Sequence, residues 1–402
     1  MTRFFNRRSG LLVALLGVVA LVASACGSSS GDGGSWVIGM LGTNTGRASS
    51  SLAQGKPAME AWAAWTNAHG GVNGHKIKVV YGDDQGETSV GLSQVQKMVQ
   101  RDHIIALVGS TANSAPGIAQ YLVSKGIPVI GGTAPTYVSS VKPFPKVFYP
   151  VGPTLAASSV TSFQAAKALG GTKAAIAYCA ESSLCQSIVS TFKGFASQAG
   201  MTISHFGAVS ATAPSYTAPC LAMKNSGADS MVLAVDNHTL SSVVQQCKQQ
   251  GYSPIIIGQT VEVTPNWATD PNFAKSVGSL GAFPWWETSV PAIADYAAAM
   301  KQYDNSGDLA ASTNPGMATI VWSAGQAFAA AAKAAKLGDK PTPAQVISGM
   351  NSFSGETLGG LIGSLTFSGD QRQGSDCAFE FNIVNKAFNT LNGGKPACIS
   401  GS

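Results

Sequence analysis

Two patterns of apolar and polar positions alternate along the chain from residue 36 onward. Short runs rich in Val and Ile are typical of buried strands, and longer segments with apolar residues every three or four positions are typical of helices. In the first third of the chain these patterns predict strands at 36–41, 76–84, 104–109 and 127–132, and helices at 56–68, 89–101 and 116–126. Regular alternation of strand and helix predicts parallel βαβ units, so we expect an α/β fold.

The alternation breaks at a Pro-rich stretch, 146–153, and then restarts, which predicts a crossing into a second lobe. The second set has predicted helices at 155–169, 186–200, 216–225 and 240–250 and strands at 173–178, 201–207, 230–235 and 254–258. Another crossing is predicted near 280–286. Three predicted helices follow, at 291–303, 316–336 and 342–351, and then two β-rich segments, at 363–367 and 378–384.

The first 25 residues have the plan of a secretory signal peptide. Three arginines precede an apolar run at 11–22, and small residues occupy 23–25. An apolar run of about 12 residues is short for a membrane-spanning helix, which needs roughly 20. Cys26 follows directly and resembles the lipidated cysteine of a bacterial lipoprotein, which implies cleavage before Cys26 and a diacylglycerol group on its thiol. In the alternative, Cys26 is incidental in an ordinary exported protein.

Composition limits the classes of protein that remain. Removal of the signal leaves roughly 377 residues, enough for two domains, and the Gly/Ser-rich segment 26–35 is expected to be a flexible tether. Charged residues make up only 11% of the chain. Of the net charge of +5, three positive charges belong to the signal. No basic patch remains, so we expect no nucleic-acid partner.

The remaining six cysteines are an even number in an exported chain, which predicts up to three disulfide bonds. Among the 15 possible connectivities, we favour neighbour pairing, which joins Cys179 to Cys185, Cys220 to Cys247 and Cys377 to Cys398. Free buried thiols are the alternative. The chain has no Cys-x-x-Cys pair and no histidine spacing typical of metal ligands, so we expect no metal site and no cofactor.

Four segments of the first lobe together resemble a known family. They are "IGMLGTNTG" at 38–46, "GGVNGHKIKVVYGDD" at 70–84, "ALVGSTANSAPGIA" at 106–119 and "GIPVIGGTAP" at 126–135. In this order and spacing they are similar to the Leu/Ile/Val-binding proteins, which are type I periplasmic binding proteins and the solute-capturing components of ABC importers.

The resemblance covers nearly the whole mature chain and implies its organisation. It implies two Rossmann-like lobes joined by three crossings, with a small ligand bound in the cleft between them by hinge closure. By this implication the first lobe comprises residues 36–150 and 284–366, and the second 153–282 and 373–402. The expected partner is a membrane permease. A lipid on Cys26 would hold the protein, expected to be a monomer, at the outer face of the cell membrane beside it.

In this family the first lobe captures the carboxylate of an amino-acid ligand through two loops that follow strands. Ser114 matches the hydroxyl at the start of a helix, where free N–H groups favour an anion. Gly132 and Thr133 match the second loop, which supplies a backbone N–H and a hydroxyl. The simpler alternatives are that Ser114 only caps a helix and that Gly132 only makes a turn before Pro135.

The other half of the implied cleft departs from the family pattern. Ser51 stands where amino-acid-binding members carry an aromatic residue, and the segment "ESSLC" places Ser183 or Leu184 at the position of a tyrosine. Thr260 stands where those members use a glutamate that neutralises the ammonium group of the ligand. The ammonium site is therefore altered.

Two interpretations of this change remain open. Asp236, near the position of a second family tyrosine, or Glu262 supplies the missing charge for an amino acid. Otherwise the ligand has no ammonium group and is another small acid, amide or polar metabolite. Trp285, beside Trp286, either walls an apolar part of the ligand or only joins the lobes, and a Cys179–Cys185 disulfide would stiffen the altered loop.

Other classes of function have less support. Residues 27–31, "GSSSG", match the Gly-x-Ser-x-Gly pattern of hydrolases, but Ser29 has neither the strand before it nor the helix after it that this chemistry requires. We therefore expect no enzyme. A ligand sensor of the same fold that signals through a membrane partner is the alternative to transport.

Overall fold

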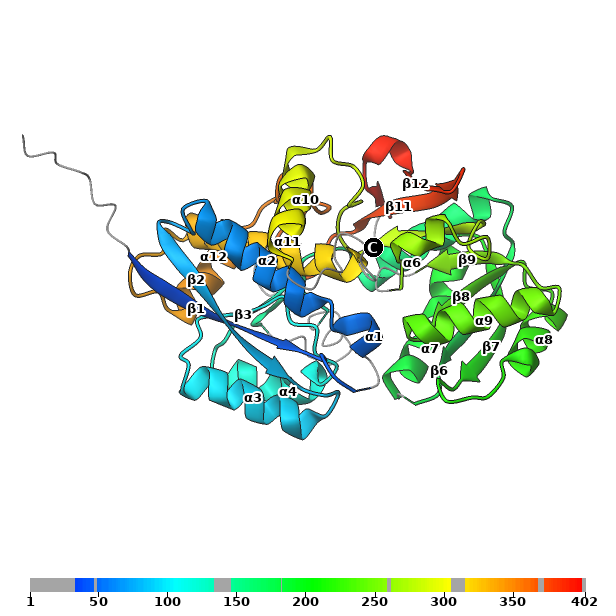
Figure 1. The fold of residues 1–402 in the computed structure, drawn as a ribbon, viewed down its shortest axis with the longest axis horizontal. Helices are drawn as coiled ribbons and strands as arrows, with labels where there is room; N and C mark the ends of the chain where they lie inside the picture. Colours follow the sequence, from blue (N-terminus) through cyan, green and yellow to red (C-terminus); the bar gives the residue numbers. More distant parts are fainter. Residues whose placement is uncertain are drawn as a thin grey trace, which may run out of the picture. The chain divides into compact units, whose positions relative to one another are not determined.

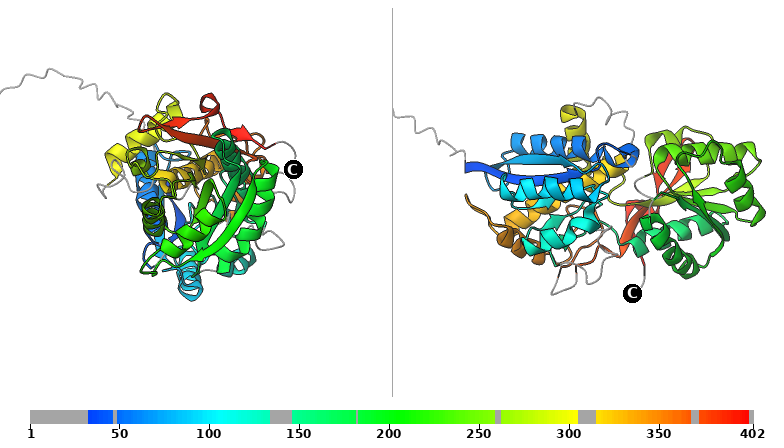
Figure 2. Two further views of the ribbon diagram at one scale, coloured as in Figure 1. Left: turned by 90° about the vertical axis from the view of Figure 1, so that its right-hand side faces the viewer. Right: turned by 90° about the horizontal axis from the view of Figure 1, so that it is seen from below.

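The computed structural model describes residues 33–46, 49–133, 146–181, 183–258, 262–304, 315–367 and 372–399. This part contains two β-sheets, each with helices on both faces (Figures 1 and 2). Residues 1–32, which include the predicted signal and Cys26, lie outside it.

The first sheet has five parallel strands in the order β2-β1-β3-β4-β5. Its strands are β1 (Gly33–Gly42), β2 (His75–Asp83), β3 (Leu107–Val108), β4 (Val129–Ile130) and β5 (Phe148–Tyr149). The helices between them are α1 (Ser49–Leu52), α2 (Gly55–Ala68), α3 (Thr88–Gln100) and α4 (Ala115–Ser124). Three later helices, α10 (Pro291–Tyr303), α11 (Pro315–Ala334) and α12 (Pro343–Asn351), join the same unit, because α10 and α11 pack on α2 and α12 packs on α11. We call this unit the first lobe.

Alternation along β1 explains the layers of the first lobe. Trp36, Ile38 and Met40 are buried in the apolar cluster that contains residues of α2 and α11, whereas Leu41 belongs to the cluster of α3 and α4. Successive side chains of a strand point to opposite faces, so one strand serves both clusters. Both faces are covered by helices, as parallel sheets require.

The second sheet repeats this topology. Its parallel strands are β6 (Lys173–Cys179), β7 (Thr202–Val209), β8 (Ser230–Ala234), β9 (Ile255–Gly258) and β10 (Ser276–Leu280), in the order β7-β6-β8-β9-β10. The antiparallel strands β11 (Cys377–Val384) and β12 (Ala387–Thr390) extend it beyond β10, and β13 (Ala397–Cys398) pairs with β11. Its helices are α6 (Leu155–Ala168), α7 (Ser183–Gln198), α8 (Thr217–Asn225) and α9 (Asn237–Gln249), with short 3₁₀ turns η1 (Pro265–Ala268) and η2 (Asn392–Gly394). We call this unit the second lobe.

The chain runs from the first lobe to the second after β5, returns after β10, and runs to the second again before β11. The first and third of these segments are hydrogen-bonded to each other: Ser375 N donates to Gly152 O at 2.8 Å, and Thr154 N donates to Ser375 O at 2.8 Å. The exact domain limits predicted above remain predictions. One predicted element is wrong: the β-rich segment 363–367 forms no strand, and only Leu365 makes an isolated bridge, with Glu356.

Three disulfide bonds join the neighbour pairs favoured from the sequence. Cys220–Cys247 connects α8 to α9 and is fully buried. The Cys179–Cys185 bond joins the end of β6 to the first turn of α7, and the Cys377–Cys398 bond joins β11 to β13. Among the helices of the described segments, none combines the length and apolar character that crossing a membrane requires.

Candidate functional site

The carboxyl ends of the first-lobe strands carry a group of polar loops. The strand order 2-1-3-4-5 reverses direction between β1 and β3, and open α/β sheets bind ligands outside the carboxyl ends of their strands at such a switch point. The segments that follow β1, β2, β3 and β4 there contain most of the first-lobe residues singled out from the sequence.

Asp84 holds three of these loops together from a fully buried position. One carboxylate oxygen accepts from Thr43 Oγ1 at 2.7 Å and from Gly86 N at 2.9 Å, and the other accepts from Ser114 N at 2.8 Å. Thr43 Oγ1 in turn accepts from Asn113 N at 3.0 Å. The loops after β1, β2 and β3 are therefore fixed around one carboxylate.

The neighbouring Asp83 orders the loop after β1. It accepts from Thr45 Oγ1 at 2.7 Å, Asn44 N at 2.9 Å and Gln85 N at 3.0 Å. Burial works to raise the pKa of Asp83, but the hydrogen bonds from Thr45, Gln85 and Asn44 outweigh it, so the pKa lies below its ordinary value.

The loop after β4 packs directly on the loop after β3. Gly132 has φ +75°, and a Cβ there would overlap the Ser110 carbonyl, so only glycine fits this backbone approach. Thr133 N donates to Ser110 O at 2.9 Å, whereas the Thr133 hydroxyl is buried and has no hydrogen-bond partner. Of the groups implied by the family resemblance, the Thr133 N–H is therefore engaged and its hydroxyl is unsatisfied.

Ser114 is at the N-cap position of α4 but does not cap it. Its backbone is helical, with φ −77° and ψ −3°, and its side chain accepts no capping hydrogen bond. The hydroxyl is buried without a partner and lies against Gly91 of α3, at the place that a Cβ of Gly91 would occupy. Capping, the simpler of the two sequence interpretations, is not observed.

A contact from the first lobe reaches the second at Ser51. Its hydroxyl accepts from Asn237 N at 3.4 Å, and Leu52 O, in the same helical turn, accepts from Thr111 Oγ1 at 3.3 Å. The helical turn that contains Ser51 therefore contacts both the loop after β3 and the start of α9.

Asp236 already has partners within its own helix. It is the N-cap of α9: one oxygen accepts from His238 N at 3.0 Å and Thr239 N at 3.1 Å, and the other accepts from Thr239 Oγ1 at 2.6 Å. A carboxylate used in this way neutralises the helix N-terminus, which accounts for an acidic residue at this position without any ligand.

The remaining candidate residues have different surroundings. Ser183 begins α7, but its side chain lies outside the described part of the structure, and Thr260 also falls outside the described residues. Glu262 follows β9 and is 5% exposed. Trp285 packs edge-on against Trp286 and Phe388, with ring centroids 4.7 and 5.5 Å apart, which is a structural arrangement around β12.

Three amide side chains were missed by the sequence analysis. The side-chain oxygens of Asn44, Gln54 and Asn237 are buried and have no hydrogen-bond partner. Asn44 and Thr111 both lie close to Gly42 at the end of β1, and Asn237 contacts Ser51. The sequence does not mark these residues, because Asn and Gln also occur in ordinary surface loops. Only their burial in the folded structure distinguishes them from exposed loop residues.

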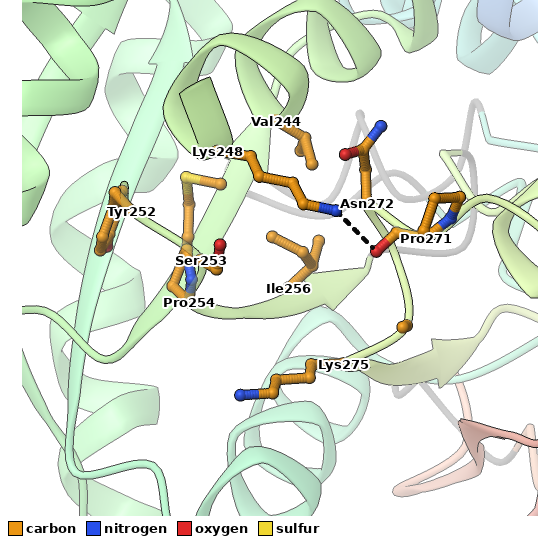
Figure 3. Close-up of a pocket in the computed structure, with 11 residues that line it drawn as sticks. Val244, Lys248, Tyr252, Ser253, Pro254, Ile256, Pro271, Asn272 and Lys275 are labelled. Carbon is orange, nitrogen blue, oxygen red and sulfur yellow. Dashed lines mark hydrogen bonds between the residues drawn. The ribbon is translucent and has the colours of Figure 1, made fainter. Parts of the chain in front are cut away.

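A cavity of about 160 Å³ lies elsewhere, at the amino ends of the second-lobe strands (Figure 3). Its lining includes the apolar side chains of Met231, Val244 and Ile256, and Lys248 Nζ donates to Pro271 O at 3.3 Å. None of the residues predicted to bind a ligand lines it. It is at the opposite end of the second sheet from Asp236.

The fold therefore consists of two mixed α/β lobes with polar loops at the carboxyl ends of their strands. The model of the periplasmic binding protein family matches residues 35–387. This chain therefore belongs to the periplasmic binding protein family, as the sequence resemblance indicated.

Solved structures share the fold at low sequence identity. A branched-chain amino acid ABC transporter protein from Thermus thermophilus with bound valine is 17% identical, with a TM-score of 0.76, over 91% of this chain and 96% of that one. A fatty acid ABC transporter substrate-binding protein from Thermomonospora curvata is 16% identical, with a TM-score of 0.73, over 91% and 93%. At such identities the likeness shows the fold alone.

One curated relative is closer in sequence over a short segment. An amino acid binding protein of Pseudomonas aeruginosa is 36% identical over 100 residues. The match spans 25% of this chain and only 27% of the length of that relative.

Proposed function

We propose that this protein is the solute-binding component of an ABC importer and captures a small polar solute between its lobes. The observation that carries the proposal is the presence of buried, unsatisfied oxygens at the carboxyl ends of the strands in both lobes: Thr133 Oγ1 in the first lobe, and Asn237 Oδ1 in the second, where the backbone of Asn237 contacts Ser51 of the first. Buried polar atoms without partners are costly, so a site that retains them is suited to a polar ligand that satisfies them.

The solute is recognised without the charge of Asp236. That carboxylate accepts three hydrogen bonds from its own helix, so the first interpretation of the lost ammonium site is left with Glu262. Hydroxyl and amide groups dominate the remaining site, which favours the second interpretation: a small acid, amide or other polar metabolite. The neighbours named for valine and for fatty acid support a binding role but do not select between these classes.

Solute binding is tested by a thermal-unfolding screen of the full-length chain against amino acids, small carboxylic acids, amides and sugars. A ligand at about 100 times its Kd adds about 2.7 kcal/mol to the free energy of unfolding. We expect a hit whose affinity falls about tenfold in Thr133→Ala, because a buried hydrogen bond to the ligand is lost. The matched control is Thr202→Ala, at the amino end of β7. No hit in any class would favour a sensor or scaffold.

The role of charge is tested separately with Asp236→Asn. Asparagine caps a helix as well as aspartate, so the variant removes the charge and keeps the cap. We expect unchanged affinity for the solute. A loss of tenfold or more in this variant would show that Asp236 binds an ammonium group and that the ligand is an amino acid.

The proposed location is the outer face of the cell membrane, with a lipid on Cys26 and residues 26–35 as a tether. The signal-like sequence before Cys26 supports this proposal. Mass spectrometry of the N-terminal peptide should find a diacylglycerol-modified cysteine. Cys26→Ser should release the protein from the membrane fraction, and an unmodified Cys26 in the mature chain would contradict the anchor.

A further inference from the structure

Arg372 is a buried cation with most of its hydrogen-bonding groups unsatisfied. It lies at the start of the segment that pairs with residues 152–154, where the chain passes to the second lobe for the last time. The residue is 8% exposed. Its Nη2 donates to Asn351 Oδ1 at 3.2 Å, but Nε and Nη1 are buried and have no hydrogen-bond partner. One N–H on Nε and two on Nη1 therefore lack an acceptor.

The groups around the guanidinium do not compensate its charge. Its Cζ lies 5.2 Å from the centroid of the Tyr149 ring, on which it stacks. The Tyr149 hydroxyl donates to the same Asn351 oxygen at 2.9 Å, so both lone pairs of that oxygen are used. Burial raises the pKa of Tyr149, although the charge of Arg372 and a side-chain hydrogen bond with Arg372 work to lower it, so the phenol is neutral at pH 7.

No described carboxylate forms an ion pair with Arg372. Among the described residues the ion pairs are Lys56–Glu60 and His75–Asp339, and neither involves Arg372. A cation taken out of water without a counter-charge costs several kcal/mol, which makes an unpaired buried guanidinium unusual in a folded protein. A bound anion is the simplest group that would remove this cost.

We propose that Arg372 anchors a small-anion site in the first lobe, at the junction of the segments that connect the lobes. The ligand is an oxyanion of carboxylate size, bound by the Nε and Nη1 groups, because the planar guanidinium fork matches such anions through paired hydrogen bonds. Tyr149 supplies the ring on which the guanidinium stacks, and Asn351 holds Nη2. The site shares no residue with the candidate solute site, so it stands independently of the proposed function.

The test is an anion titration of the full-length chain, followed by thermal unfolding at constant ionic strength. Acetate and inorganic phosphate each replace chloride stepwise. Wild type should show a saturable rise in Tm of about 2 °C or more. Arg372→Met, which keeps the volume and loses the charge, should show no rise. Arg101→Met, at the exposed C-cap of α3, should behave as wild type.

The variants also separate a true site from a buried charge. Without added anion, Arg372→Met should unfold at a temperature no lower than that of wild type, because an uncompensated buried charge has been removed. Arg372→Lys keeps the charge but not the fork and should weaken anion binding about tenfold. An equal rise in Tm in wild type and all three variants would be a general salt effect and would overturn the proposal. The absence of a saturable response in wild type, in thermal unfolding and in calorimetry, would also overturn it.

Discussion

The loops around Asp84 and the junction around Arg372 bury opposite charges in different ways. Asp84 is fully buried and accepts hydrogen bonds from three loops. Arg372 is nearly as buried, yet one of its nitrogens has an acceptor and two have none. A buried charge that is fully hydrogen-bonded can organise a scaffold, whereas one with unsatisfied donors is suited to binding an added partner, as proposed for Arg372.

The same comparison distinguishes residues that position the loops of the candidate solute site from residues whose polar groups are available to a ligand. Asp84 contributes no free oxygen to a ligand, because its partners come from Thr43, Gly86 and Ser114. Its contribution is to hold the loops after β1, β2 and β3 in one arrangement, and the unsatisfied side-chain oxygen of Asn44 lies in the first of these loops.

The largest effect is expected from Asp84→Ala. The substitution leaves Ser114 N and Thr43 Oγ1 buried without an acceptor, and we expect a loss of about 3 kcal/mol in the free energy of unfolding. Urea unfolding at an unchanged m-value measures it. The control, Asp295→Ala on the exposed side of α10, should lie within about 0.5 kcal/mol of wild type. A loss of stability as small in Asp84→Ala would show that the hydrogen bonds of Asp84 do not stabilise the fold, which would contradict the difference drawn between Asp84 and Arg372.

Gly132→Ala is expected to have the next largest effect. At φ +75° a Cβ overlaps the Ser110 carbonyl, so the loop after β4 must move, at a cost of about 2 kcal/mol. Gly126→Ala isolates the backbone strain, because Gly126 has φ +62° but open space around it. We expect that control to cost about 1 kcal/mol. Equal losses in the two variants would show that the contact with Ser110 is not restrictive.

The smallest effect is expected from Glu380→Gln in β11. Burial raises the pKa of Glu380, and the hydrogen bond from Asn392 Nδ2 at 2.6 Å only partly opposes it. A carboxyl whose pKa is raised in the folded state costs stability as the pH rises above its unfolded pKa of about 4. Glu380→Gln should therefore be more stable than wild type at pH 7, by less than about 1 kcal/mol, and equal to it at pH 3.

Unfolding curves at pH 3, 5 and 7 check this sign. The exposed Glu87→Gln is the matched control and should show no such difference between pH values. If Glu380→Gln is less stable than wild type at pH 7, the charge of Glu380 is compensated in the fold. Glu380 would then be a buried charge satisfied by its hydrogen bonds, as Asp84 is, and not an unsatisfied one like Arg372.

Much of the fold follows from the sequence pattern. The strand at β1 and the helix at α2 were predicted nearly to their ends, because the period of apolar residues differs between them and depends only on local geometry. The segment 363–367 was wrong because its alternation indicates a strand but no partner strand lies beside it beyond one bridge. Whether a segment forms a strand depends on an adjacent strand with which its backbone can pair, and not only on its own sequence.

The candidate site was less predictable. Ser51 lies at a contact between the lobes, but Ser114 turns its hydroxyl against Gly91, and Trp285 packs in an aromatic cluster with Trp286 and Phe388. A residue type at a matching position indicates what chemistry is available. Its rotamer and its neighbours decide whether that chemistry reaches the site.

The sequence by itself determined the alternation of strands and helices and indicated the two lobes and the family, because these depend on periodicity and order along the chain. It favoured the neighbour pairing of cysteines, and the structure contains these three pairs. Only the tertiary structure decided that Asp236 is committed to a helix cap, that Asp84 is fully satisfied and that Arg372 is not. Hydrogen-bond satisfaction depends on residues such as Tyr149 and Asn351, which lie 202 positions apart in sequence. Only folding brings them together, and no local pattern in the sequence records such distances.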